Sequence, residues 1–173
     1  MRERDASLDE ALVSEIFDAS YRRLVTQVYA AIGDRDEAED AVQEAFAKAV
    51  AAGRKWREVT NHEAWLRTVA LNSFRTRARR RRLFQRAHPV ISTPSESPGV
   101  SEDHVAVMAA LGQVGEHHRV VLALHYFADL SVAEIAAELG LPAGTVKTRL
   151  MRGREALHQY LDAGALISEV RHG

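Results

Sequence analysis

The 173-residue chain is 46% hydrophobic, carries a formal net charge of −1 and contains no cysteine. This length and apolar content support one or two small domains with real cores, and the lack of cysteine excludes disulfides and thiolate metal sites. The start holds no apolar run that resembles a signal peptide, and no apolar stretch approaches about 20 residues, so we expect a cytoplasmic protein without a membrane segment.

The small net charge conceals a strong segregation of acids from bases. Residues 1–44 hold twelve acids and five bases, whereas residues 65–86 hold eight arginines and no acid. The segment 34–46, DRDEAEDAVQEAF, alone carries six carboxylates. Charge runs are often only solvated helix faces, but eight arginines without an interleaved acid are hard to explain in that way. The segregation therefore indicates two partners, one attracted to each sign of charge.

Apolar residues at helical spacing predict two long helices at the start of the chain. The first spans about 9–32, and its stripe is Leu12, Ile16, Phe17, Leu24, Val25, Val28 and Ile32. Gly33 and Asp34 then break the run, with Asp34 as a candidate N-cap. The second helix spans about 35–52, and its stripe is Ala38, Ala41, Val42, Ala45, Phe46, Ala49 and Val50. Packing of this stripe would hold the carboxylates outward.

After a predicted loop at 52–60, a third helix spans about 62–84. Its buried stripe is Trp65, Leu66, Val69, Ala70 and Phe74, and the arginine run begins where that stripe ends. Residues 87–104 hold three of the four prolines and are typical of an extended linker. The remainder is again helical, without strand alternation or repeats. We therefore predict an all-α protein of two small helical domains, 9–86 and 105–163, joined by a flexible linker and followed by a tail at 164–173.

Residues 130–157, LSVAEIAAELGLPAGTVKTRLMRGREAL, have the organisation of a helix-turn-helix. Ser131 and Glu134 have the spacing of a capping box. Gly140 suits the left-handed residue that ends a helix, and Pro142 suits the first turn of the next one. Ile135, Ala136 and Leu139 are expected to face inward from the first of these two helices.

The second helix of this motif has one apolar and one polar side. Val146, Leu150 and Leu157 are expected to be buried. At about 100° per residue, Lys147, Thr148, Met151 and Arg152 lie opposite, with Arg149 and Arg154 on the flanks. Such a face fits a DNA major groove, where Lys and Arg donate to guanine and flanking Arg contact phosphates. The alternative is an ordinary pair of helices with a cationic surface.

These segments resemble bacterial sigma factors. The helix-turn-helix resembles region 4, which reads the −35 promoter element. EAEDAVQEAF resembles the early part of region 2, and AWLRTVALNSFRTRARRRR resembles its later part, which recognises and melts the −10 element. The order, spacing and extent, about 14–85 and 106–161, are similar to the extracytoplasmic-function (ECF) group. The resemblance implies a factor that directs promoter-specific initiation by core RNA polymerase, is monomeric when free, and needs no cofactor.

The resemblance also implies roles for residues. In the family, the helix like 35–50 docks on a coiled coil of the largest polymerase subunit, and the flap is a further contact. This places docking on Asp36, Glu37, Asp40, Gln43 and Glu44. Asn72 would help to line the pocket for a flipped −10 base, although a plain surface amide is the alternative. Backbone contacts would come from Arg75, Arg77, Arg79 and Arg80, while Arg81 and Arg82 would contact upstream phosphates or lead into the linker.

Other classes of function fit the sequence less well. A stand-alone helix-turn-helix regulator would dimerise through its first half, but residues 9–84 show no heptad seam. An enzyme would need a nucleophile–base set or a phosphate-binding loop, and neither is present. His117, His118 and His125 lack carboxylate partners at ligand spacing, so we expect structural histidines and no metal. An anti-sigma factor is a common partner in the group, and no feature of the sequence requires one.

Overall fold

The computed structural model of the protein describes residues 2–85 and 102–172, and side chains are described for residues 10–81 and 105–162. Every regular element in these ranges is an α-helix, which confirms the all-α prediction. The chain divides into two compact units, Met1–Tyr29 with Asp34–Pro94 and Ala30–Gly33 with Ser95–Gly173. None of the described helices combines the length and the apolar character that a membrane span requires.

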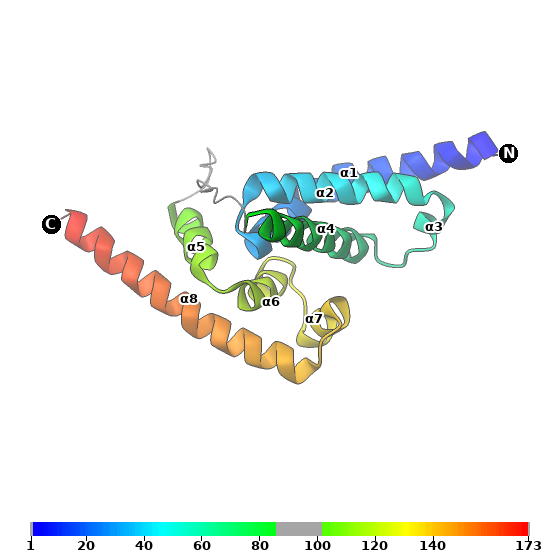
Figure 1. The fold of residues 1–173 in the computed structure, drawn as a ribbon. Coiled ribbons are helices and arrows are strands. Elements are labelled where there is room, and N and C mark those ends of the chain that lie inside the picture. The colour runs from blue at the N-terminus through cyan, green and yellow to red at the C-terminus, as the bar shows by residue number, and fades with distance from the viewer. Residues whose placement is uncertain (1, 86–101, 173) are drawn as a thin grey trace. The chain divides into compact units, whose positions relative to one another are not determined.

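The first unit is built from α1 (Arg2–Ile32), α2 (Arg35–Ala52), α3 (Arg54–Arg57) and α4 (His62–Gln85). The three long helices lie side by side, and α3 lies at one end of them (Figure 1). The predicted second and third helices agree with α2 and α4 to within one residue, whereas α1 begins seven residues earlier than predicted. Asp34 is the N-cap of α2, as predicted: its side chain accepts a hydrogen bond from the Glu37 amide at 3.0 Å.

An alanine seam holds α2 against α4. We use this name for Ala38, Ala41, Ala45 and Ala49, which are all fully buried on one side of α2. Because their side chains are short, α4 can approach the backbone of α2 closely and pack Leu66 and Ala70 nearby. Most of the predicted α2 stripe is confirmed in this way.

Two residues of the predicted stripes were placed wrongly. Val50 is 47% exposed and Phe17 is 38% exposed, so neither belongs to the core. Val50 follows Ala49 by one residue, which turns it about 100° away from the centre of the seam. Phe17 stacks on Tyr21 with ring centroids 4.5 Å apart and meets the edge of Phe46, which keeps it at the rim of the α1–α2 contact.

Trp56 anchors the connection that was predicted to be a loop. It lies in the short helix α3 and is fully buried. Its ring meets Trp65 edge-on at 5.1 Å and lies 4.5 Å from the ring of His62, while its own carbonyl contacts His62 Nε2 at 3.2 Å. Burial of so large an aromatic fixes the start of α4 relative to the end of α2. Trp65, predicted to be buried, is only half-buried because Trp56 takes the interior position.

Alongside the alanine seam, ion pairs add to the α2–α4 contact. Arg77 pairs with Glu44, and its Nε lies 3.6 Å from a Glu37 oxygen. Arg81 donates to Glu37 at 2.6 Å, and the Ser73 hydroxyl donates to Glu44 at 3.0 Å. We call this group, Glu37, Glu44, Ser73, Arg77 and Arg81, the α2–α4 polar seam. It follows the buried stripe of α4 with the same helical spacing, so one face of α4 is apolar near its start and charged near its end.

The second unit consists of α5 (Glu102–Gln113), α6 (Glu116–Tyr126), α7 (Val132–Leu139) and α8 (Ala143–His172). Its apolar core is formed by side chains of all four helices: Met108, Leu111, Val121, Leu122, Leu124, Ile135, Val146 and Leu150. Because α5 begins at Glu102, the last three residues of the predicted linker 87–104 are helical. The predicted tail at 164–173 is likewise a helical continuation of α8 as far as His172. The remaining linker residues up to 101 lie outside the described ranges.

The helix-turn-helix is formed by α7, a tight turn and the start of α8 (Figure 1). Ser131 and Glu134 form the predicted capping box, with both reciprocal hydrogen bonds present. Gly140 adopts the predicted left-handed conformation at φ 64°, and its amide donates to the Ala136 carbonyl. Pro142 was predicted in the first turn of the second helix, but it directly precedes α8. Its carbonyl accepts a hydrogen bond from the Val146 amide.

Gly153 lets α8 lie close to α6. This glycine is buried inside α8, where a glycine costs about 1 kcal/mol relative to alanine. A Cβ at this position would lie 3.0 Å from Leu122 Cδ1 and 3.3 Å from His118 Cβ, which is tighter than ordinary contact. The absence of a side chain therefore sets the distance between the two helices, and with it the placement of the outward face of α8.

We expect Gly153→Val to destabilise the protein by about 1–3 kcal/mol, because overpacking at this contact would displace α8 from α6. Chemical denaturation followed by circular dichroism measures the loss. The control is Gly112→Ala, where an added Cβ meets no atom within 4 Å; this change should stay within about 0.5 kcal/mol. Equal stability of Gly153→Val and the parent protein would contradict the close packing of α6 and α8.

The polar seam also predicts a dependence of stability on pH. Lys48, 2.8 Å from the Glu44 carboxylate, lowers the pKa of Glu44 through its hydrogen bond, Ser73 and Arg77 lower it further, and partial burial opposes them. A carboxyl whose pKa is lower in the folded state stabilises the fold above its unfolded pKa, about 4.3, and this contribution is lost as the pH falls through the folded value. Because Glu44 is partly exposed, we expect it to contribute at most about 1 kcal/mol at neutral pH.

Comparison of Glu44→Gln with the parent protein from about pH 7 down to about pH 3 tests this expectation. The difference in unfolding free energy should be present at neutral pH and should vanish at the acidic end. Both tryptophans, Trp56 and Trp65, lie in the first unit, so tryptophan fluorescence follows the unfolding of that unit. Asp40→Asn, the control at an exposed position on α2, should change stability by less than about 0.5 kcal/mol. A Glu44→Gln difference that persists at acidic pH would refute the role of the charge.

Candidate nucleic-acid and protein interfaces

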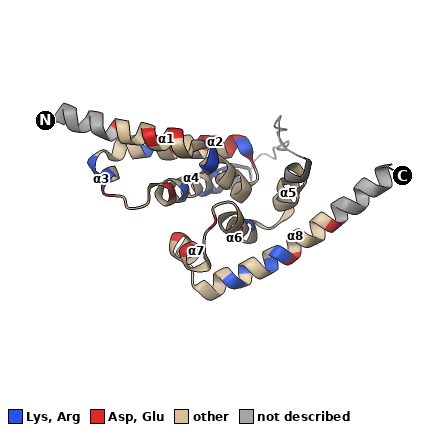
Figure 2. Ribbon diagram, turned by 180° about the vertical axis from the view of Figure 1, so that it is seen from behind, with Lys and Arg blue, Asp and Glu red and all other residues tan. Residues whose placement is uncertain are grey.

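The first part of α8 turns the predicted DNA-reading face to solvent. Lys147, Thr148, Met151 and Arg152 are exposed, and Met151, at 53%, is among the most exposed apolar residues described. Val146 and Leu150 are buried on the opposite side, and Leu157 is half-buried. Figure 2 shows Lys and Arg following one another along this part of α8. A helix with a packed back and a basic, partly apolar front can enter a major groove, where a methyl group of thymine and the edges of guanine are contacted.

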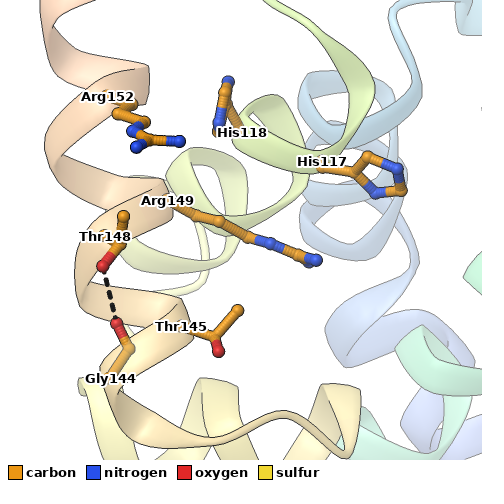
Figure 3. A pocket seen from close by; sticks show the side chains of 7 residues that line it. All are labelled: His117, His118, Gly144, Thr145, Thr148, Arg149 and Arg152. Carbon is orange, nitrogen blue, oxygen red and sulfur yellow. Dashed lines mark hydrogen bonds between the residues drawn. The ribbon is translucent and has the colours of Figure 1, made fainter.

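The two predicted flanking arginines differ in their surroundings. Arg154 is held against α6: its Nε donates to the Tyr126 hydroxyl at 2.8 Å, and its guanidinium lies 5.7 Å from the centre of the Tyr126 ring. This double contact fixes the direction of Arg154 and leaves its terminal nitrogens available. Arg149 is half-buried and points into a pocket between α6 and α8 (Figure 3).

This pocket contains two residues that were predicted to be merely structural. His117 and His118, at the start of α6, line it together with Arg149 and Arg152 of α8. Sequence spacing cannot place them there, because they precede these arginines by about thirty residues. Within residues 10–81 and 105–162, no group of three or more His, Asp or Glu side chains has a geometry that would hold a metal ion.

On α4, the predicted −10 contacts separate into two groups. Arg75, Arg79 and Arg80 are exposed, and none of them forms an ion pair with another described residue. Asn72 is also exposed on the helix surface, with its side-chain amide not engaged in any hydrogen bond to the described residues and its backbone carbonyl accepting from the Thr76 hydroxyl. These four side chains are available to a nucleic acid. Guanidinium groups suit phosphates, and an amide can both donate to and accept from a base edge.

Arg77 belongs to a different environment from the other predicted −10 contacts. It is part of the α2–α4 polar seam, where it pairs with two of the carboxylates predicted to dock polymerase, Glu37 and Glu44. Arg81, predicted to contact upstream phosphates or lead into the linker, is also paired with Glu37, and Arg82 lies outside the described side chains. The sequence did contain a signal for this pairing. Both arginines continue the helical spacing 66, 70, 73, 77 and 81, which places them on the side of α4 that faces α2.

Arg67 corrects the interpretation of the arginine run itself. It was counted among the eight basic residues, yet it is only 3% exposed. Its guanidinium donates to the Gln27 side chain of α1 at 3.0 Å. On the same side of the unit, Arg23 of α1 forms an ion pair with Glu63 of α4. The cationic surface of α4 is therefore shorter than the sequence suggested.

The acidic face of α2 is divided in the same way. Glu37 and Glu44 turn toward α4, whereas Asp36, Asp40 and Gln43 are exposed. The exposed residues follow each other at intervals of four and three, so they share one side of the helix. Gln43 donates from its side chain to the Tyr21 hydroxyl at 3.3 Å. Of the predicted docking residues, the outward ones are thus two carboxylates and one amide rather than four carboxylates and one amide.

Aromatic side chains lie beside this outward face, which sequence reasoning did not anticipate. Phe17 and Tyr21 of α1 stack on one another, Phe46 of α2 meets them, and Tyr21 is joined to Gln43 as described above. We call Phe17, Tyr21 and Phe46 the aromatic rim. Aromatic groups next to polar ones are common at the centres of protein–protein interfaces. The arrangement therefore suits a protein partner better than a nucleic acid.

Two family models match the chain in the order of its two units. Residues 16–84 match the model described as Sigma-70 region 2, and residues 104–157 match Sigma-70, region 4. The first match contains α2 and α4 with the polar seam, and the second contains the helix-turn-helix and the histidine pocket.

Individual proteins show the same similarity over most of the chain. The ECF RNA polymerase sigma factor SigL of Mycobacterium tuberculosis is 34% identical over 166 residues, which cover 88% of this chain and 90% of SigL. The ECF RNA polymerase sigma factor SigW of Bacillus subtilis is 29% identical with the same coverage of both chains. In three dimensions, the sigma factor RpoE of Bartonella quintana, solved in complex with the anti-sigma factor NepR, aligns with a TM-score of 0.75. That alignment has 27% identity and covers 86% of this chain and 96% of RpoE.

The similarity therefore extends through both units and their order, at an identity that is sufficient to assign a family. The basic front of α8, the exposed arginines of α4 and the acidic face of α2 all lie within the matched regions. The chain belongs to the ECF group of the sigma-70 family of RNA polymerase sigma factors.

Proposed function

We propose that this chain binds core RNA polymerase and directs it to promoters, reading the −35 element with α8 and opening the −10 element with α4. The observation that carries the proposal is the outward face of α8, where Lys147, Thr148, Met151 and Arg152 stand opposite a packed helix-turn-helix core. Arg149 and Arg154 flank this face. The factor acts in the cytoplasm, where its polymerase acts, and is not itself an enzyme.

The first unit supplies the other two activities in this proposal. Asp36, Asp40 and Gln43, bordered by the aromatic rim, dock on the coiled coil of the largest polymerase subunit, and the polymerase flap is a further contact. Arg75, Arg79 and Arg80 hold the backbone of the opened −10 strand, and Asn72 contacts a displaced base. In this proposal residues 9–86 dock on polymerase and melt the −10 element, residues 102–163 read the −35 element, and the segment between them links the two units. The segment 164–173 has no assigned role.

The polar seam changes the roles that we propose for two predicted docking residues, Glu37 and Glu44, and for one predicted −10 contact, Arg77. In the free protein Glu37, Glu44 and Arg77 satisfy one another across α2 and α4. Their contribution to function is then to hold the docking helix and the −10 helix in a fixed relation. A direct contact of Arg77 with DNA would require it to leave two carboxylates, so we assign it to positioning.

Partners beyond polymerase and promoter DNA follow from the relatives. The related RpoE was solved with an anti-sigma factor. We propose a comparable inhibitor for this chain. A stand-alone regulator is the second candidate. It would bind closed duplex tightly without polymerase, and the family assignment does not favour it.

Run-off transcription with purified core polymerase, on fragments of the genome that encodes this chain, tests the proposal. We expect promoter-specific transcripts only when the protein is added. The double variant Asp40→Ala with Gln43→Ala should reduce polymerase binding at least about tenfold, as expected when central interface contacts are lost, without a change in stability. Glu58→Ala, which removes the exposed acid directly after α3, is the matched control and should be active.

The proposal fails if no specific transcript appears although polymerase is active with another factor. Tight binding of the protein alone to a duplex, together with that failure, would establish the stand-alone regulator in its place. Full activity of the Asp40 and Gln43 double variant would refute only the docking surface.

The proposed reading of duplex DNA by α8 gives a separate expectation for Lys147. We expect Lys147→Ala to lose about 1–3 kcal/mol of discrimination at one base pair of the −35 element, because a base-edge contact is removed. Anisotropy measurements on the promoter duplex and on its single base-pair variants measure this loss. Lys55→Ala, which removes an equal charge from α3, should leave discrimination unchanged. An equal loss on every duplex would contradict a base contact and assign Lys147 to a phosphate.

A further inference from the structure

A pocket of about 410 Å³ lies within the second unit, between the start of α6 and the first turns of α8. Its lining consists of His117, His118, Gly144, Thr145, Thr148, Arg149 and Arg152. Figure 3 shows Arg149 and Arg152 reaching out from α8 and the two histidines supplied by α6. The volume exceeds that of a phosphate group, so a phosphate can enter together with a few water molecules.

The lining favours an anion. It contains two arginines and two histidines but no carboxylate. Arg149 and Arg152 are permanent cations, and each imidazole can add a charge when it is protonated. The Thr145 hydroxyl is a further polar group, whereas the Thr148 hydroxyl already donates to the Gly144 carbonyl at 3.0 Å. Both helices begin near the pocket, so their first amides add to the positive potential.

Charged groups on the neighbouring helices do not cancel the positive charge of the pocket lining. On α6, Glu116 and Arg119 flank the histidines with opposite signs, and on α7 the acids are Glu134, held in the capping box, and Glu138. On α8, Glu155 follows the lining residues. None of these five residues lines the pocket, and the described side chains of α5 carry no charge.

The position of the pocket indicates which anion it would take. Thr148, Arg149 and Arg152 belong at once to the lining and to the face of α8 that we propose for the −35 duplex. A duplex in contact with Lys147 and Met151 would bring its sugar–phosphate backbone along the edge of this face, since recognition helices are bordered by phosphates of the groove they enter. Binding of the promoter duplex to α8, as proposed above, would therefore bring a backbone phosphate to the pocket.

We propose that this pocket holds one backbone phosphate of the promoter duplex, and that protonation of His117 and His118 strengthens the contact, so that affinity for the promoter rises as the pH falls. The inference rests on the proposed function. Its physical basis is that a protonated imidazole gives a charge-assisted hydrogen bond to phosphate, whereas the neutral ring gives a weaker one. Binding takes up protons, and the gain is lost as the pH rises through the range in which histidines titrate, about pH 5 to 8.

The test compares binding to the promoter duplex at about pH 6 and about pH 8 at constant ionic strength. For the parent protein we expect about fivefold to tenfold tighter binding at the lower pH, the effect of one or two charge-assisted hydrogen bonds. The double variant His117→Gln with His118→Gln should bind equally at both values. His158→Gln is the matched control, because His158 is an exposed histidine of the same helix as the arginines but lies outside the pocket. Circular dichroism at both pH values confirms that each variant is folded.

Two further experiments distinguish a backbone phosphate of DNA from a free phosphate ion. Neutral methylphosphonate is introduced at one duplex position at a time, and we expect the pH dependence to disappear at one position only. Inorganic phosphate is titrated into the free protein while the imidazole proton resonances are recorded, and the signals of His117 and His118 should shift saturably while that of His158 does not. If phosphate binds but no methylphosphonate alters the pH dependence, the pocket serves a free anion and the DNA contact is refuted.

Failure of the inference is distinguishable from failure of the proposed function. A parent protein that initiates transcription and binds its promoter, but whose double variant keeps the full pH dependence, overturns the pocket alone. A protein that neither initiates nor binds promoter DNA overturns the proposed function. In that case the titration with inorganic phosphate still decides whether the pocket binds an anion, and unshifted signals of His117 and His118 would refute it.

Discussion

The close packing of α2 on α4 is the constraint on which the first unit depends. Four alanines of α2 are fully buried along one side of the helix, and a larger side chain at any of them would push the packed helices apart. The same closeness lets Glu37 and Glu44, which alternate with these alanines along α2, reach Arg77 and Arg81 near the end of α4. The apolar and charged contacts therefore lie side by side along α2. This packing leaves Asp36 and Asp40 of α2, and Arg75, Arg79 and Arg80 of α4, facing solvent. The two proposed binding faces are therefore supported by the same pair of packed helices.

The second unit obtains its function from a similar use of small residues. Gly153 allows α8 to lie against Leu122 of α6, and Val146 and Leu150 fill the space before it. This packing decides the rotation of α8 about its own axis. Once that rotation is set, Lys147 and its neighbours face outward and Arg149 faces the start of α6. A single helix thereby supplies the proposed reading face and one wall of the pocket, which is why the two are expected to act on the same stretch of DNA.

Local sequence signals were sufficient for most helices and for the helix-turn-helix. The period of the alanines predicted α2, and the capping box and Gly140 predicted the ends of α7, because each of these depends on residues a few positions apart. Contacts between distant residues were not accessible in the same way. Glu44 and Arg77 are separated by 33 positions, and each was assigned to a different partner until the fold brought them together. Trp56 was missed because a four-residue helix with one buried side chain has no period to detect.

The acidic stretch at the start of α2 presents fewer unpaired carboxylates to a binding partner than its sequence indicates. Of its six carboxylates, one caps the helix, one pairs with Arg35 within α2, and two belong to the polar seam. Only Asp36 and Asp40 remain turned outward with neither a hydrogen bond nor an ion pair from their side chains to any described residue. Two exposed charges screened by salt give little long-range attraction, so recognition of a protein partner must depend on short-range contacts. Gln43 and the exposed ring of Phe17 are available for such contacts. The largely neutralised polar seam also weakens the negative field that acts on the arginines of α4.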